Sequence, residues 1–116
     1  MILYTAQYRY NGEDRYDITV KSGNKIFAPT WNIVMDYKNN IITAEEYTKE
    51  YHNLMVKSYY NNLNEWNKLL NEEQITLVCF CKSGDFCHRL LLAEYLSKLD
   101  AEYLGERNLK EKRIII

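Results

Sequence analysis

The sequence lacks the features of a membrane-bound or exported protein. None of its apolar runs approaches the ~18 residues that a membrane-spanning helix needs, so we expect no membrane span. The N-terminal segment MILYTAQYRY has no basic region that leads into a long apolar stretch, and we therefore expect no signal peptide. Cysteines are few, and all three lie between Cys79 and Cys87. An odd and clustered set argues against a secreted disulfide framework, so we expect a cytoplasmic protein.

An excess of charge of one sign is also missing. The formal net charge of −1 gives no overall attraction to nucleic acid or to an anionic membrane, and we expect neither as a partner. A content of 47% hydrophobic and 27% charged residues is typical of a folded globular chain. No internal repeat, low-complexity segment or linker divides the sequence. We therefore predict a single domain over residues 1–116.

Hydrophobic periodicity predicts alternating strands and helices. Strands are expected at residues 2–8, 15–20, 75–81 and 101–104, and helices at residues 31–38, 44–70 and 87–99. Thr43 and Glu46 have the spacing of a capping box, and the helix after them is expected to be continuous or to break near Asn61-Asn62. The dipeptide Asn11-Gly12 predicts a hairpin of the first two strands. These elements predict an α/β domain with a small, mixed, partly parallel sheet flanked by helices.

The segment CFCKSGDFCHR, residues 79–89, carries most of the reactive side chains. A buried strand, a short loop with Ser83 and Gly84, and a helix start together form an anion site, because backbone N–H groups and the helix dipole face the loop. Cys87 at the helix start is then the candidate thiol. His88 adds a candidate acid or base, and Arg89 a fixed cation that can clamp an anion.

Zinc binding is an alternative use of the same segment. Cys79, Cys81, Cys87 and His88 are all zinc ligand types. Their spacing is unusual, since one residue separates the first pair and none separates the second. We therefore predict no metal and no other cofactor.

A purely structural use of the segment is the other alternative. Cys79, in the middle of a buried strand, is expected to be a small core residue. Asp85 has the position of an N-cap, and Arg89, four residues later, has the position to pair with it.

Residues after the other strands and turns are further binding candidates. Ligands of α/β sheets bind outside the carboxyl ends of the strands, so Tyr8 and Arg9 are placed to line such a crevice. Trp31 suits stacking against a base or a sugar. His52 lies in a polar stretch and is expected on the surface. The eleven tyrosines and the apolar C-terminal end make a homodimer a candidate assembly.

The segment LVCFCKSGDFCHRLLLAEYL resembles the signature of domain of unknown function 488 (DUF488). That family shows an apolar strand that ends in Leu-Cys, a short polar loop, and Cys-His-Arg at the start of a helix that contains Leu-Ala-Glu. The corresponding residues are Val78-Cys79, the loop 82–86, Cys87-His88-Arg89 and Leu92-Ala93-Glu94. The resemblance is strongest over residues 76–94. It implies a compact α/β domain with no known reaction, and it places the emphasis on Cys87, His88 and Arg89.

The second predicted strand differs from the family pattern. The family often reads Asp-Val-Arg there, whereas this chain has Asp17 and, four residues later, Lys21. Lys21 is therefore the candidate to replace the charge of that arginine.

We therefore expect an enzyme or binding domain for a small anionic ligand, phosphate-like or nucleotide-like, at the start of the Cys-His-Arg helix. One alternative is a non-catalytic interaction protein in which Cys-His-Arg only locks strand to helix. The other is a structural zinc domain.

Overall fold

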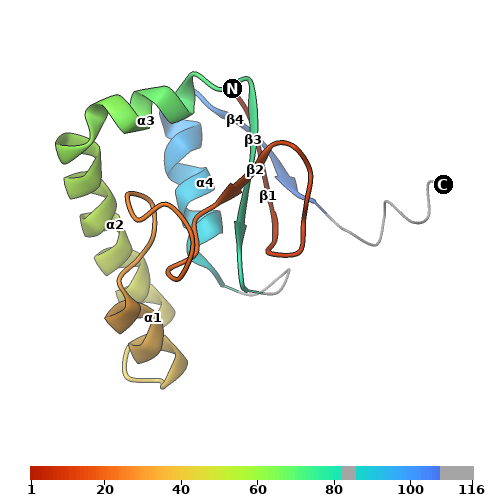
Figure 1. Ribbon diagram of the computed structural model, residues 1–116. Coiled ribbons are helices and arrows are strands. Elements are labelled where there is room, and N and C mark those ends of the chain that lie inside the picture. The colour runs from red at the N-terminus through yellow and green to blue at the C-terminus, as the bar shows by residue number, and fades with distance from the viewer. Residues whose placement is uncertain (82–85, 108–116) are drawn as a thin grey trace.

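The computed structural model describes residues 1–81 and 86–107. In chain order its elements are β1 (Ile2–Gln7), β2 (Arg15–Asp17), α1 (Trp31–Lys38), α2 (Ala44–Asn61), α3 (Leu63–Leu70), β3 (Gln74–Cys79), α4 (His88–Lys98) and β4 (Glu102–Glu106) (Figure 1). None of the helices in this described part is long and apolar enough to cross a membrane. The basic and apolar C-terminal end lies outside the described residues.

The four strands form one parallel sheet in the order β2-β3-β1-β4. The α/β class is therefore confirmed, but the hairpin of the first two strands is wrong, because β3 lies between β1 and β2 and runs parallel to both. The reason lies in the composition of β3. Its apolar run ITLVC is buried at every position, and such a strand takes a central place in a sheet with both faces covered. The sheet is accordingly parallel throughout and not mixed.

The helices cover one face of the sheet, as Figure 1 shows. Ile75 and Leu77 of β3 point to that side and belong to the main core. Side chains alternate along a strand, so Val78 and, on β1, Ala6 point to the other face. There they pack with Tyr10, which comes from the connection between β1 and β2. This connection covers the face that the helices leave open.

Local capping signals set the helix limits. The Thr30 hydroxyl accepts a hydrogen bond from the Ile33 N–H at the start of α1. Thr43 and Glu46 make both hydrogen bonds of the predicted capping box at the start of α2. Asn62 separates α2 from α3, so of the two alternatives for this segment the structure has the break and not the continuous helix.

A buried ion pair ties α4 to the sheet. Arg89 on α4 is completely buried, and its Nε and Nη2 donate to the two carboxylate oxygens of Glu106 on β4 at 3.1 and 2.7 Å. Its Nη1 lies 2.9 Å from the carbonyl oxygen of Cys81 and 3.0 Å from the Sγ of Cys79, at the end of β3. One guanidinium thus joins α4, β3 and β4.

Replacing Glu106 by alanine removes the carboxylate that lies 2.7 Å from the buried guanidinium of Arg89. We expect the Glu106→Ala variant to lose about 3–5 kcal/mol of its free energy of unfolding, measured by urea titration. The control is Glu94→Ala, which removes the ion pair with Lys98 on the surface of α4, where the two side chains are 61% and 71% exposed. That variant is expected to lose less than about 1 kcal/mol. Equal losses in the two variants would contradict the role given to Arg89.

A second polar cluster holds the connection between β1 and β2 against the sheet. The Asp14 carboxylate accepts hydrogen bonds from Thr76 at 2.6 Å, from Gln74 at 2.8 Å and from the Tyr10 hydroxyl. Arg107 approaches it to 3.5 Å. Burial raises the pKa of Asp14, but these hydrogen bonds and the nearby guanidinium outweigh burial and lower the pKa to about 2.

The lowered pKa of Asp14 makes stability depend on pH. Its ionisation stabilises the fold above the pKa of the unfolded chain, about 4, and this contribution is lost as the pH falls towards about 2. In urea titrations over this pH range, we expect the free energy of unfolding of the Asp14→Asn variant to fall by about 2 kcal/mol less than that of the unmodified sequence. The control is the same substitution at the exposed Asp100. The same slope in both variants would exclude the Asp14 contribution.

Candidate functional site

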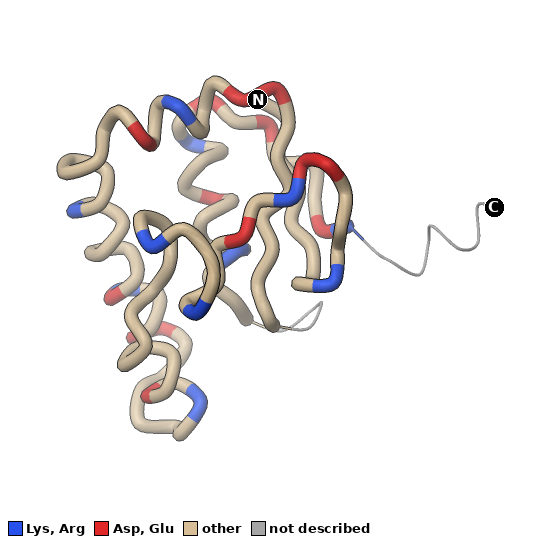
Figure 2. The backbone as a smooth tube through the Cα atoms, in the orientation of Figure 1, with Lys and Arg blue, Asp and Glu red and all other residues tan. Residues whose placement is uncertain are grey.

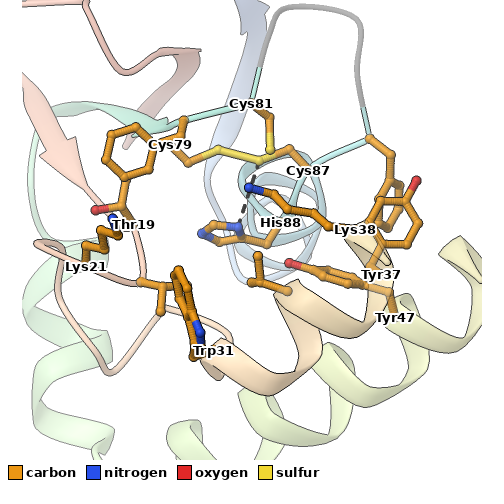
Figure 3. Close-up of a pocket in the computed structure, with 14 residues that line it drawn as sticks. Thr19, Lys21, Trp31, Tyr37, Lys38, Tyr47, Cys79, Cys81, Cys87 and His88 are labelled. Atoms are coloured by element: carbon orange, nitrogen blue, oxygen red, sulfur yellow. Dashed lines mark hydrogen bonds between the residues drawn. A yellow bond between two sulfur atoms is a disulfide. The ribbon is translucent and has the colours of Figure 1, made fainter. Parts of the chain in front are cut away.

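A cavity of about 700 Å³ lies past the carboxyl ends of β2 and β3 (Figure 3). Its described lining comes from residues 19–21 after β2, residues 79–81 at the end of β3, residues 86–88 at the start of α4, one face of α1, and Tyr47 of α2. Ligands of α/β sheets bind at this end of the strands. The cavity therefore has the location of a ligand site.

Helix α1 forms one wall of the cavity. Trp31, Val34 and Lys38 have i, i+3, i+7 spacing, so they share a face of the helix, and all three line the cavity. In Figure 3 the Lys38 side chain points into the cavity. Lys21, after β2, lies with its Nζ 5.8 Å from the centre of the Trp31 ring. Trp31 is among the predicted binding residues. Lys38 is not, although its spacing from Trp31 is a signal that the sequence carries.

A disulfide forms the floor of the cavity. It joins Cys79, at the end of β3, to Cys87, the residue that precedes α4 (Figure 3). Cys79 is only 1% exposed, so its predicted place in the core holds, but its bond to Cys87 is not part of that prediction. The two cysteines are eight positions apart in the chain, and the fold brings them together because the strand end and the helix start meet at this edge.

The third sulfur lies beside this disulfide. The Sγ atoms of Cys79, Cys81 and Cys87 all lie within 4.8 Å of one another. Cys81 follows β3 by two residues and is half-buried, whereas the other two are buried. The unusual spacing in the sequence therefore does not keep the three sulfurs apart. They have the positions to hold a metal ion if the disulfide is reduced.

His88, the first residue of α4, is held as a neutral imidazole. Its Nε2–H donates to the carbonyl oxygen of Ile18 at 2.7 Å, which leaves Nδ1 as an acceptor. Nδ1 lies 3.8 Å from the Sγ of Cys87. Burial lowers the pKa of His88 to about 4, and the Arg89 cation also lowers it, while the bond to Ile18 opposes the shift. This geometry is suited to accepting a proton from a reduced Cys87.

Arg89 is buried beside the site and is not among the described residues that line the cavity. Its guanidinium contacts Glu106, the carbonyl of Cys81 and the sulfur of Cys79. Its role as an anion clamp stays a prediction. The other partner predicted for it, Asp85, lies outside the described residues.

The remaining predicted binding residues have different places. Tyr8 is half-buried and stacks on Phe80 with ring centres 4.3 Å apart, but it is not among the described lining residues. Arg9 is exposed and also lies outside that lining. Ser83 and Gly84 lie outside the described residues. The structure thus brings Trp31 together with the Cys-His pair in one cavity, and the roles of all these residues stay predictions.

The pKa of His88 has a measurable consequence. We expect its imidazole signals to shift only as the pH falls towards about 4, with the Nε2–H tautomer present above that pH, in ¹H–¹⁵N NMR spectra. A His52→Gln variant removes the only other histidine and so assigns the signals. Protonation of His88 near neutral pH would contradict its burial against Ile18.

Comparison with known proteins adds the family. The model of the active DUF488-N3 subclade matches residues 2–100, which include every described element except β4. No curated protein and no solved structure gives a significant match. The matched range contains the whole Cys-His-Arg segment and the two strands that end at the cavity. The chain therefore belongs to the DUF488 family.

Proposed function

We propose that this domain binds a small anion with a flat ring, such as a nucleotide-like phosphate ester, in the cavity above the disulfide. Cys87 and His88 then supply thiol chemistry to this ligand once the disulfide is reduced. The observation that carries the proposal is the pairing of two lysines and exposed aromatic rings around the mouth with a thiol–imidazole pair at the floor.

The charges of the described lining favour an anion. Lys21 and Lys38 are its cations, and it contains no aspartate or glutamate. Figure 2 shows acidic and basic residues interspersed over the chain, so the attraction is local to the cavity. The start of α4 adds to it, because the first turn has no acidic residue and Cys87 makes no side-chain cap hydrogen bond there. The positive end of the helix dipole is thus directed at the floor.

The aromatic side chains favour a flat group on the ligand. Trp31 is 49% exposed and Phe80 is 57% exposed, and both line the cavity. Tyr37 and Tyr47 line it more deeply, with ring centres 5.5 Å apart. When a base or another ring stacks on exposed rings of this size, apolar surface is removed from contact with water, and this favours binding.

The floor supports nucleophilic chemistry. Two-electron reduction of the disulfide yields a Cys87 thiol beside Nδ1 of His88, and the bond to Ile18 keeps that nitrogen free of a proton. His88 takes the thiol proton as the sulfur attacks the phosphorus of the ester. The S–P bond forms, the P–O bond to the alcohol breaks, and His88 returns the proton to the departing alkoxide. Burial and the Arg89 cation disfavour a standing imidazolium, so the thiolate forms during the reaction and not before it.

Ligand binding is tested by thermal denaturation of the reduced protein with inorganic phosphate and with nucleoside monophosphates. At about 100 times the Kd the free energy of unfolding rises by about 2.7 kcal/mol, which raises the Tm by about 10 °C in a domain of this size. We expect Lys21→Ala and Lys38→Ala to reduce this shift by at least half at the same concentration. Lys57→Ala, an exposed lysine of α2 that lies outside the cavity lining, is the control and should keep it.

The absence of any shift would contradict the proposal and favour a non-catalytic interaction protein. Zinc is the second candidate, and the observation that favours it is the approach of three sulfurs to within 4.8 Å. One zinc ion per chain in the reduced protein, with all three thiols protected from alkylation, would identify the site as a metal centre.

A further inference from the structure

The three sulfurs of the cavity floor differ in their access to solvent. Cys79 and Cys87, which form the disulfide, are 1% and 2% exposed. Cys81 lies outside the disulfide and is half-buried. A thiol that enters the cavity therefore meets Cys81 more readily than it meets the disulfide sulfurs.

Cys81 also has the distance that thiol–disulfide exchange requires. Its Sγ lies within 4.8 Å of both sulfurs of the disulfide, so small side-chain movements bring it into contact with either. Exchange proceeds by attack of a thiolate on one sulfur while the other leaves as a thiolate.

Arg89 distinguishes the two disulfide sulfurs. Its Nη1 lies 3.0 Å from the Sγ of Cys79, and it is completely buried there. A cation at this distance stabilises a thiolate on Cys79, and a stabilised thiolate is the better leaving group. Attack by Cys81 is therefore directed to Cys87, with Cys79 as the group that leaves.

We propose that Cys81 is the relay thiol through which an external dithiol reduces the buried Cys79–Cys87 disulfide. The inference deepens the proposed function and rests on it for the role of Cys87, because the relay sets whether that thiol is available to the ligand. The co-reactant is a small dithiol, or a dithiol on a redox protein that reaches the cavity mouth.

Reduction through Cys81 takes three thiol–disulfide exchange steps. The Cys81 thiolate attacks Cys87, the Cys81–Cys87 bond forms, the Cys79–Cys87 bond breaks, and Cys79 leaves as a thiolate beside Arg89. A thiolate of the external dithiol then attacks Cys81 and releases Cys87, which takes up a proton. The second external thiol attacks the mixed disulfide and releases Cys81. The dithiol gives two electrons to the disulfide and becomes a cyclic or intramolecular disulfide; one of its two protons ends on Cys87 and the other is released to solvent, because Cys79 stays a thiolate.

The test is the rate of disulfide reduction in the full chain. Protein oxidised with diamide is treated with about 0.1 mM dithiothreitol, quenched with acid, alkylated and mapped by mass spectrometry. We expect the Cys81→Ser variant to be reduced at least about tenfold more slowly than the unmodified sequence, because an intramolecular thiol has an effective concentration in the millimolar range or above. Cys81→Ala should behave in the same way, which separates loss of the thiol from an effect of the serine hydroxyl.

A second variant traps the intermediate. Cys79→Ser leaves the two sulfurs that the relay joins, and its oxidation should give a Cys81–Cys87 disulfide. Reduction of Cys81→Ser at the unmodified rate would overturn the relay, as would failure of the oxidised protein to form the Cys79–Cys87 disulfide. Tight zinc binding by the reduced protein that protects all three thiols would overturn it as well.

The same variants keep the two proposals apart. The phosphate and nucleotide melting shift, measured on reduced Cys81→Ser, reports the anion site without the relay. A retained shift with an unchanged reduction rate would reject only the relay. A slow reduction without any melting shift in the parent protein would reject only the ligand.

Discussion

The buried guanidinium of Arg89 is the charge on which the rest of the structure depends. A cation that is completely enclosed must have a carboxylate and further acceptors, since an isolated buried charge costs far more than a small domain can offset. Glu106 supplies the carboxylate, and the end of β3 supplies the carbonyl of Cys81 and the sulfur of Cys79. These partners fix the start of α4 against two strands. The same contacts therefore set the positions of Cys87 and His88, the two residues that precede Arg89 in the Cys-His-Arg motif.

Charged and uncharged side chains are separated within the cavity. The floor is built from sulfur and a neutral imidazole and is enclosed by β3, α4 and the carbonyl of Ile18. The mouth carries the charges and rings, with Lys21 after β2 and Trp31 and Lys38 on α1. Arg89 influences the floor through its field, since it opposes a proton on His88 and favours a negative charge on Cys79. In the disulfide-bonded protein the cations thus lie at the mouth, while the disulfide and the neutral imidazole of the floor carry no charge.

Local features of the fold can be predicted from the sequence. Features that depend on residues far apart in the chain are predicted less well. The capping box of Thr43 and Glu46 follows from a signal within a few residues, and the structure confirms it. The dipeptide Asn11-Gly12 is an equally local signal, but the pairing of β1 is decided by β3, some 70 residues away, whose apolar side chains require the centre of the sheet. A turn preference does not outweigh that burial.

The candidate site divides in the same way. Cys87, His88 and Arg89 are evident because they are adjacent in one motif. Glu106 and Lys38 are not evident, because only the fold brings them to that motif. The bond between Cys79 and Cys87 belongs to the second group as well, since a buried strand cysteine has no sequence feature that separates a packed thiol from a bonded one.

The hydrogen bond from His88 to Ile18 has a consequence for how this site can vary among related chains. The acceptor is a main-chain carbonyl, which every amino acid possesses, so the residue at position 18 is free to change as long as it fills the same part of the core. The group that orients the imidazole then leaves no mark in an alignment of side chains. What must be retained is the path of the backbone after β2, and this path is kept by the Asp17 carboxylate, which accepts from the Thr19 N–H at 2.8 Å and from the Ser22 hydroxyl at 2.6 Å. The orientation of the histidine therefore also depends on the side chains of Asp17 and Ser22, which stabilise the turn that presents the Ile18 carbonyl.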